Sequence, residues 1–458
     1  MSGTTCTPST RQHIFSWGFV VLFCAVSLSL SASVAAAKTT SRIGALAVHG
    51  HWTHWNQGQA PTDAACRAAI QVPCYSPQEI RQAYNLAPLV NQGIAGKGQT
   101  IVIIDSFGSP TALADLKKFD ADYGLPDPPS FKQLAPIGSV PFDPTNNDQV
   151  GWAEETSLDI QWAHSMAPAA NIVVLTSPVS ETQGVQGMPE FLKLEQYAVA
   201  QHLGKIISQS WATTENTLFT PQGQAVFNGF ESFYQWAALN RVSVFSSAGD
   251  SGSANVDVNG NTYPFPTVGY PASSPWVTAV GGTSLYADTN GNYQKETVWN
   301  DGVGSATGGG VSQYFKEPVY QKFLPAQTQK LLKGYRGLPD ISMNADPNTP
   351  IPVYLGFLGS SSGYYLFGGT SESAPLWAGL TADANQYVGH PLGFLNPDLY
   401  LLGLDKRQAS EVFHDITVGN NSQGSIPGYS ATVGWDATTG WGSPIAQPLF
   451  KALQGCAS

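Results

Sequence analysis

The chain has 458 residues, enough for one large or two medium domains, and 42% of them are apolar. Its formal net charge is −11, and only 12% of its residues are charged, about half the usual share. A sparse, acidic surface argues against nucleic acid and anionic membranes as partners, and it suits an acidic medium, where protonated carboxyl groups carry less charge.

The first 37 residues have the pattern of a secretory signal peptide. Arg11 and His13 precede the apolar run "IFSWGFVVLFCAVSLSL", and the small residues "SASVAAA" lead to a cleavage point after Ala37. The alternative is a membrane anchor, although the alanine-rich end favours cleavage. Because no later stretch is long and apolar enough to span a bilayer, we expect a secreted protein with no stable membrane partner.

Residues 38–74 are polar, and we interpret them as a short N-terminal arm. Cys66 and Cys74 are close in sequence in a segment expected to be exported, so a disulfide between them is predicted. In the chain-entropy model a loop this short contributes about 2.5 kcal/mol. Cys456 has no obvious partner.

From residue 75 onward, short apolar strands alternate with helices. The predicted strands are 99–105, 171–177, 205–211 and 242–252, and the predicted helices are 111–124, 151–166, 189–201 and 222–240. Apolar strands that alternate with helices indicate a mostly parallel sheet with helices on both faces. We therefore expect one large α/β domain over residues 75–458, in which the Gly- and Pro-rich stretches after residue 252 form long loops.

Three candidate site residues come at the ends of these strands. In a parallel sheet of this class the site lies at the carboxyl ends of the strands, where Asp105, Trp211 and Asp250 stand. Asp250 lies in the turn "SSAGDSGS", and turns favour aspartate for conformational reasons alone.

The stretch "FGGTSESAPLWAGL" places Ser371 before a predicted helix. A serine there can be a nucleophile or simply the cap of the helix. A nucleophilic serine needs a base to accept its proton. None of the histidines beyond the signal and the arm opens a helix in an "HGT"-like setting, so the sequence provides no convincing histidine base.

The predicted helix at 151–166 provides acids instead. At 100° per residue Glu155 and Asp159 share a stripe with Trp152, whereas Glu154 lies on a polar stripe and is expected to be solvated. Residues four apart on a helix have Cβ atoms about 5–6 Å from each other, so two desolvated carboxyls there would share a proton. The alternatives are a buried salt bridge or an amphipathic edge.

Together these three elements resemble the sedolisin family, the serine-carboxyl peptidases with a subtilisin-like fold. The resemblance covers about residues 72–458 and rests on "GTSES" followed by proline, on "EETSLD" and on "AGDSG". The stretches "MAPAANIVVL", "YPASSPWVTAVGGTS", "GGGVSQYF" and "RGLPDISMNADP" are also similar to the family.

The resemblance implies a secreted, acid-acting serine-type endopeptidase that cleaves proteins or peptides through an acyl-enzyme, and we expect a monomer. It assigns Ser371 as nucleophile, Glu155 as general base, Asp159 as the group that orients the base, and Asp250 as the oxyanion donor. The residue types suit acid, because a histidine is protonated at about pH 3–4 whereas a carboxylate with a slightly raised pKa can still accept a proton.

The resemblance also implies a supporting network. Asp105 and Trp211 occupy the places of an acid and a tryptophan that hydrogen-bond with the Glu/Asp pair in related enzymes. The acid is usually glutamate in the family, so Asp105 is a shorter substitute. The alternative for Trp211 is packing in the core.

The C-terminal region resembles the calcium site of the family. "HDITVG" and "SATVGWDATTGWGSP" would supply carboxylates from Asp415 and Asp436 and backbone carbonyls from Ile416, Thr432 and Gly434. Ca²⁺ takes six or more oxygen ligands, so a mixture of carboxylates, carbonyls and water is suitable. The family usually has glycine at position 432.

One departure leaves other functions open. Family members usually carry a large folded propeptide, and the roughly 37 residues between the predicted cleavage point and the peptidase region are too few for one. A catalytically inactive, peptidase-like binding protein is therefore an alternative. A second alternative is an ordinary subtilisin-type enzyme with Asp105 as its aspartate, and tripeptidyl-peptidase activity also remains open.

Overall fold

The sheet at the centre of the protein is apolar on both faces. The computed structural model describes residues 51–302 and 304–456, so the predicted signal peptide lies outside the described residues. In strand β2 (Thr100–Ser106), Ile101 and Ile103 pack into one apolar cluster, and Val102 and Ile104 pack into another. Because successive side chains of a strand point to opposite faces, both faces of the sheet need a cover.

The strand order of this sheet is β10-β9-β7-β5-β2-β4-β3, and β13 also pairs with β9. Every pair is parallel except β10–β9, which confirms the predicted mostly parallel sheet. The bounds are β3 Phe131–Leu134, β4 Asn171–Ser177, β5 Ile206–Gln209, β7 Ser243–Ser247, β9 Thr278–Ala287, β10 Tyr293–Val298 and β13 Ile341–Asn344.

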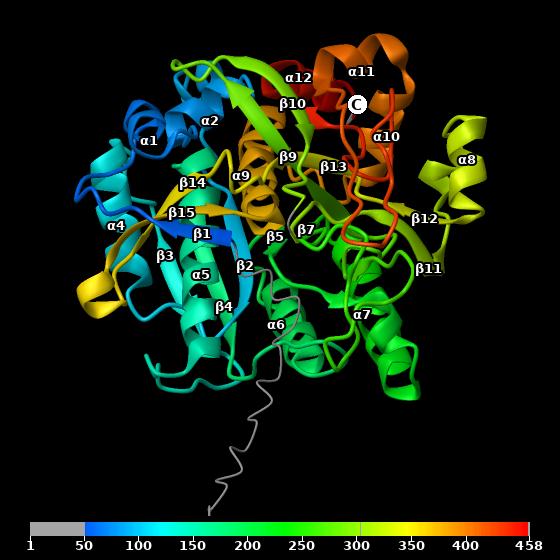
Figure 1. Ribbon diagram of the computed structural model, residues 1–458, viewed down its shortest axis with the longest axis horizontal. Coiled ribbons are helices and arrows are strands. Elements are labelled where there is room, and N and C mark those ends of the chain that lie inside the picture. The colour runs from blue at the N-terminus through cyan, green and yellow to red at the C-terminus, as the bar shows by residue number, and fades with distance from the viewer. Residues whose placement is uncertain (1–50, 303, 457–458) are drawn as a thin grey trace, which may run out of the picture. The chain divides into compact units, whose positions relative to one another are not determined.

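Helices cover both faces of the sheet, as predicted (Figure 1). One apolar cluster includes α5 (Asn147–Met166) and α9 (Thr370–Val388), and the other includes α6 (Met188–Ala200) and α7 (Pro221–Leu239). Helices α5 and α9 touch directly at Gly379, where an added Cβ would lie 2.5 Å from the Met166 Cβ. This close approach positions the two helices that carry Glu155 and Ser371.

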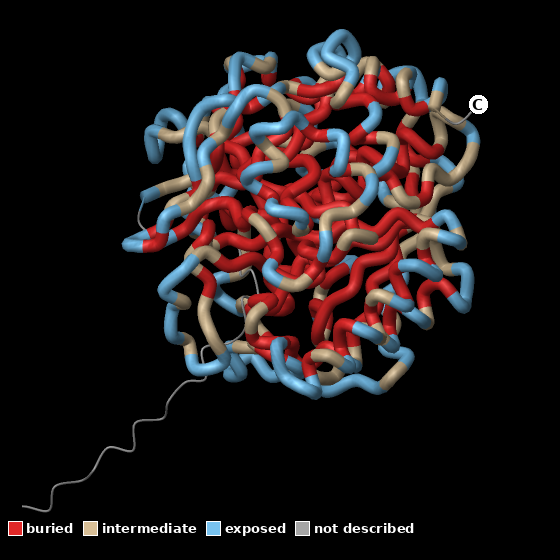
Figure 2. Tube along the Cα trace, turned by 90° about the vertical axis from the view of Figure 1, so that its right-hand side faces the viewer, coloured by how far each residue is buried: buried red, intermediate tan, exposed pale blue. Residues whose placement is uncertain are grey.

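Helix α5 differs from the prediction in two ways. It begins at Asn147 rather than at residue 151, because the Asn146 side chain accepts hydrogen bonds from the Asp148 and Gln149 amides at 3.0 and 3.4 Å. It is also buried along nearly its whole length. Figure 2 shows that buried segments fill the interior of the domain and that exposed segments lie around them. The predicted polar stripe is therefore wrong, and Glu154 is a buried residue.

The segment interpreted as an arm is partly built into the domain. Strand β1 (His51–His54) is the edge strand of a three-stranded sheet of order β1-β15-β14, with β15 at Gly363–Gly368 and β14 at Ile351–Leu355. Figure 1 shows β1, in blue, beside the yellow β15, which leads directly into α9. The predicted disulfide between Cys66 and Cys74 is confirmed.

The region after residue 252 has more regular structure than the predicted long loops, since β8 to β17 and five helices lie there. The remaining elements are α1 Asp63–Ile70, α2 Pro77–Ala83, α3 Ala87–Val90, α4 Ala112–Tyr123, β6 Thr213–Thr214, β8 Gly269–Tyr270, β11 Gly310–Lys316, α8 Ala326–Leu332, β12 Tyr335–Leu338, α10 Asn396–Leu404, α11 Lys406–Val412, β16 Phe413–His414, β17 Ser443–Pro444 and α12 Ala446–Cys456, with three short 3₁₀ turns. Within the described ranges, no helix is long and apolar enough to cross a membrane.

Candidate active site

The candidate site lies where the order of strands reverses. The chain runs from β2 past β4 to the edge strand β3, comes back to β4, and then crosses to β5 on the other side of β2. Such a switch point is the usual site position in α/β sheets. Asp105 is near the carboxyl end of β2, Ser210 follows β5, and Asp250 follows β7. Helices α5 and α9 bring Glu155, Asp159 and Ser371 to this edge.

Glu155 faces the predicted nucleophile. The Ser371 hydroxyl lies against the Glu155 carboxyl, and both side chains are buried. Neither Glu155 oxygen completes a hydrogen bond of normal geometry within the described structure, and catalytic hydrogen bonds often tighten only with substrate bound. Burial raises the pKa of Glu155 well above its usual range, the Asp159 charge raises it further, and the Ser371 contact opposes both.

Asp159 and Asp105 complete a cluster of three buried carboxyls. The Ser210 hydroxyl donates a 2.8 Å hydrogen bond to the Asp159 carboxyl. Burial and then the Asp105 charge raise the pKa of Asp159, while burial raises the pKa of Asp105 to about 7 against the opposing effect of the Thr156 side chain. Because these carboxyls interact, they release their protons in steps that belong to the cluster as a whole.

Asp250 approaches the same point from β7. Its Oδ1 accepts hydrogen bonds from the Thr370 amide and hydroxyl, both at 2.8 Å, and the Gly249 amide donates to that hydroxyl at 3.0 Å. Since Thr370 directly precedes Ser371, these bonds fix the Asp250 carboxyl one residue from the serine. The charge of Asp250 also acts on the pKa of Glu155.

Trp211 does not make the predicted hydrogen bond. Its ring packs against Phe191 and Phe230, with centroid distances of 4.5 and 6.0 Å. The indole Nε1 has no hydrogen-bond partner among the described residues. The geometry therefore favours the core-packing alternative, and Ser210, one residue earlier, is the group that reaches Asp159.

Other titratable groups near these helices are engaged elsewhere. Glu372, next to Ser371, accepts a 2.7 Å hydrogen bond from Asn344 Nδ2, and it faces that residue rather than acting as a base. His164, on the same helix as Glu155, lies 3.3 Å from Asp120 and is fully buried. The structure thus assembles carboxyls around Ser371, and the histidine of α5 belongs to a separate pair.

The predicted calcium ligands come together in the C-terminal region. The Gly434 amide donates to Asp415 Oδ2 and the Thr432 amide donates to Asp436 Oδ2, both at 2.9 Å. Ile416 directly follows Asp415. The described residues contain no group of three or more His, Cys, Asp or Glu side chains that could hold a metal. Two carboxylates with carbonyls and water form an all-oxygen set that suits Ca²⁺.

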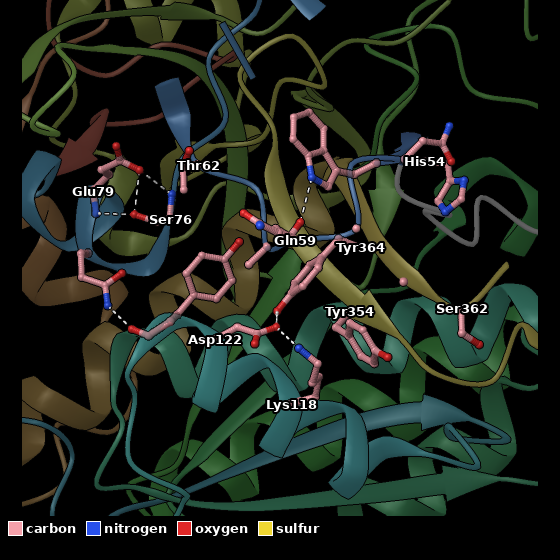
Figure 3. Close-up of a pocket in the computed structure, with 17 residues that line it drawn as sticks. His54, Gln59, Thr62, Ser76, Glu79, Lys118, Asp122, Tyr354, Ser362 and Tyr364 are labelled. Atoms are coloured by element: carbon pink, nitrogen blue, oxygen red, sulfur yellow. Dashed lines mark hydrogen bonds and ion pairs between the residues drawn. The ribbon is translucent and has the colours of Figure 1, made fainter. Parts of the chain in front are cut away.

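A cavity of about 970 Å³ lies away from this cluster, between the β1–α1 segment, α4 and the β14–β15 hairpin (Figure 3). The Tyr364 hydroxyl donates to Asp122 at 2.7 Å, and the Trp55 indole donates to the Gln59 carbonyl at 2.9 Å. The lining residues include none of the predicted catalytic ones. The chemistry of the protein therefore does not follow from this cavity.

Several supporting residues were not predicted. Ser210 and Thr370 directly precede the predicted site residues Trp211 and Ser371 in the sequence. That adjacency could have identified both as site residues. Thr156, whose side chain lowers the pKa of Asp105, had no distinct signal. The Trp52 side chain lowers the pKa of Glu154 against the effect of burial, and nothing in the sequence joins these two distant residues.

Comparison with known proteins identifies the family of the chain. The model of the subtilase family matches residues 145–397, which include all four predicted catalytic residues. Kumamolisin from Bacillus sp. (strain MN-32) is 38% identical over 394 residues, and sedolisin from Pseudomonas sp. (strain 101) is 31% identical over 353 residues. The matches cover 84% and 75% of this chain, respectively.

A solved structure of Pseudomonas sedolisin, described as a serine-carboxyl proteinase in complex with pseudo-iodotyrostatin, superposes with a TM-score of 0.70 at 28% identity. It covers 84% of this chain and 99% of that one, and it confirms the predicted subtilisin-like fold. The chain spans 64% of the length of kumamolisin and 56% of that of sedolisin. By its family match and its fold, the chain belongs to the subtilase family.

Proposed function

We propose that the protein is a secreted, acid-acting serine-type endopeptidase that hydrolyses proteins through an acyl-enzyme at Ser371. The observation that carries this proposal is the contact between Ser371 and the Glu155 carboxyl inside a buried carboxyl cluster. The resemblance to kumamolisin and sedolisin supports it.

In the proposed reaction Glu155 removes the hydroxyl proton of Ser371 as the oxygen attacks the carbonyl carbon of the substrate. Asp250, in its protonated form, donates a hydrogen bond to the oxyanion, and the N-terminus of α9 also favours negative charge there. Glu155 then gives the proton to the departing amine. Water, activated by the same carboxyl, hydrolyses the acyl-enzyme, while Asp159 keeps the base oriented.

The carboxyl cluster supports activity in acid. Two neighbouring carboxyls rarely ionise together, so the first proton leaves the cluster at a much lower pH than the last. A base is then available while the cluster still holds protons. Asp250 must keep its own proton to act as a donor, so activity falls as the pH rises.

The test is a pH–activity profile on a denatured protein substrate, measured for the wild type and Ser371→Ala. We expect a maximum below neutral pH and complete loss in the variant. Ser232→Ala on the exposed face of α7 is the control and should keep wild-type activity. An active Ser371→Ala protein would overturn the proposal, and a maximum near pH 8 would favour a subtilisin-type mechanism.

We further propose that Asp415 and Asp436, with the carbonyls of Ile416, Thr432 and Gly434, hold one structural Ca²⁺. The support is the hydrogen-bonded loop that gathers both carboxylates beside residues 432–434. Asp415 Oδ2 and Asp436 Oδ2 each accept one amide and retain a second lone pair for a cation, whereas Asp436 Oδ1 is occupied by Thr438 and Thr439. The ion would stabilise the loop and takes no part in the proposed acyl transfer.

A further inference from the structure

A second cavity, of about 730 Å³, lies outside the carboxyl cluster around Ser371. Its walls come from the loop before β9, from the turn that follows β11, and from α10 with the segment before it. Its lining includes none of the predicted catalytic residues. A cavity of this volume has the size of a binding site for a small organic molecule.

Aromatic rings wall this cavity. The Phe394 ring centroid lies 5.4 Å from that of Trp276 and 6.0 Å from that of Tyr320, and the Tyr320 centroid lies 4.8 Å from that of Tyr400. The planes of these three pairs meet at 43°, 66° and 52°, so the rings form walls of different orientation rather than a stack. The face of an aromatic ring is electron-rich and attracts cations.

The tyrosine hydroxyls of these walls are already engaged. Tyr320 donates a 2.8 Å hydrogen bond to the Pro275 carbonyl, which joins two walls of the cavity. Tyr400 donates to Asp340 Oδ1 at 2.9 Å. The walls are therefore held in place without a ligand, and the rings offer carbon surfaces rather than hydroxyl groups to one.

Two carboxyl groups, Glu317 and Asp398, line the same cavity. Glu317 Oε1 is buried and has no hydrogen-bond partner among the described residues. Burial raises the pKa of Asp398, and within the described ranges no hydrogen bond or cation opposes that shift. Because a desolvated carboxylate without a partner is costly, a bound cation would stabilise both groups.

The cations of the protein near this cavity are engaged elsewhere. Lys316 lines the cavity, but its ammonium lies over the Tyr335 ring, 3.8 Å from the centroid. Arg336 lies 5.8 Å from the Tyr320 centroid, but it is fully buried and pairs with Asp340 at 2.6 Å. The two carboxyls of the lining therefore remain available to a ligand.

The rim of the cavity is apolar and exposed. Val319, Phe323 and Leu401 are 69%, 70% and 61% exposed, and all three line the cavity. Large apolar side chains that gather at one exposed place mark a binding surface more often than scattered ones do. A ligand that matches this site has an apolar body as well as a positive charge.

We propose that this cavity binds a small amphiphilic cation, which is an ammonium group on an apolar body. The ammonium group lies between the two carboxyls and the ring faces, and the apolar body lies against the exposed rim. The charge of the lining favours this ligand over a neutral or anionic one of the same shape. The inference goes beyond the proposed peptidase function and does not depend on it.

The experiment is a calorimetric titration of the full chain at pH 7 with three probes of equal apolar length. Hexyltrimethylammonium carries a charge that does not titrate, 1-hexanol is neutral, and hexanoate is an anion. We expect the cation to bind about 10-fold more tightly than 1-hexanol, because only the cation interacts with the carboxyls and the ring faces. Hexanoate should bind more weakly than either.

Variants assign the binding to this cavity. Asp398→Asn and Glu317→Gln keep the shape of the lining and remove one charge, so each should weaken binding of the cation about 5- to 10-fold and leave binding of 1-hexanol unchanged. Phe323→Ala removes part of the rim and should weaken binding of both probes. Glu411→Gln on α11 and Leu239→Ala on α7 are matched controls at exposed positions, and both should bind as the wild type does.

Four results would overturn the proposal. Equal affinities for the three probes, or tighter binding of hexanoate, would show that charge does not select the ligand. Unchanged binding of the cation in both carboxyl variants would place it elsewhere on the protein. Absence of binding at a probe concentration of about 10 mM would leave no cation site. If sedimentation then shows self-association that Phe323→Ala abolishes, the rim is an interface with a second copy of the chain.

Discussion

A carboxyl can serve as the base for Ser371 only if it loses a proton within the working pH range. Glu155 alone, buried as it is, would hold its proton too tightly. The charges of Asp159 and Asp105 raise that pKa further, so Glu155 ionises most readily while both neighbours keep their own protons. The residue that acts as base therefore depends on neighbours that never touch the substrate.

The proposed role of Asp250 can be tested with two substitutions. Asp250→Ala removes the oxyanion donor and should lower kcat about 100- to 1,000-fold. Asp250→Asn keeps the oxygen that accepts the hydrogen bonds from Thr370 and adds an amide donor that does not titrate. This variant should therefore lose less of its kcat than Asp250→Ala and should keep its activity to higher pH. The measurement is kcat at pH 4 and pH 7; equal losses in both variants at both pH values would contradict the role.

Sequence reasoning at this scale placed Glu155 and Asp159 correctly on one buried face of a helix, because an i,i+4 spacing fixes a shared face wherever the helix lies. It failed for Glu154, because nearly every face of α5 is buried. A polar stripe on a helix indicates a solvated face only when the helix lies at the surface. It also failed for the partner of Asp159, because Ser210 and Trp211 differ by one residue and only the backbone decides which side chain points inward.

At the scale of elements, the strand before Ser371 is confined on several sides. Gly368 has no room for a side chain, because an added Cβ would lie 2.5 Å from the Pro347 nitrogen and 2.7 Å from the Ala345 carbonyl oxygen. The Gly369 amide also donates to that oxygen at 2.6 Å. The end of β15 is thus held by backbone contacts as well as by β1.

Gly368→Ala should therefore be strongly unfavourable. Overpacking of this kind costs about 1–3 kcal/mol, so we expect a lower melting temperature and reduced turnover. Gly363→Ala, at the other end of the same strand, is the control, because its added Cβ would meet nothing closer than 3.8 Å. Calorimetry on both variants checks the difference; equal melting temperatures would show that the strand can shift to make room.

The elements that the sequence predicted are those whose pattern is local. Apolar strands and the helices between them gave β2, β4, α6 and α7 to within a few residues. Strand β1 has four residues, and β9 contains two adjacent glycines, so neither has a distinctive pattern. Both strands form because they pair with strands that are remote in sequence. A single sequence gives no information about which remote strands will pair.

At the scale of the molecule, buried carboxyls outnumber the buried cations that could balance them among residues 51–302 and 304–456. Burial raises the pKa of many acids, and the most strongly affected are Glu155, Asp159, Glu181, Glu195, Glu372 and Asp383. Burial also raises the pKa of Glu231 and Glu154 to about 7. The folded protein consequently holds protons that the unfolded chain would release.

This imbalance predicts that stability is greatest in acid. A carboxyl whose pKa is raised by folding stabilises the folded state. This contribution is complete when the pH is below the unfolded-state pKa of about 4, and it is lost as the pH rises through the folded-state pKa. The free energy of unfolding should therefore fall steadily between about pH 4 and pH 8. Urea titrations of Ser371→Ala protein, which cannot digest itself in the proposed mechanism, give this curve; a maximum near pH 7–8 would contradict it.

Calcium should add to stability in a way that depends on Asp436. A chelator should lower the melting temperature of the wild type, and added Ca²⁺ should restore it. The Asp436→Asn variant should have a lower melting temperature than the wild type, and neither the chelator nor added Ca²⁺ should change it. Mg²⁺ is the control ion, because it prefers a smaller octahedral shell and should restore little. A chelator response retained in the variant would place the ion elsewhere.

The pairing of β1 with β15 also bears on when the proposed peptidase can first act. His51 and Gly368 are separated by more than 300 residues of chain, so this sheet closes one of the longest loops in the protein. Such remote contacts form late in folding, and during synthesis the first strand must wait for its partner to leave the ribosome. A nascent chain would thus remain proteolytically silent until almost all of it has been made.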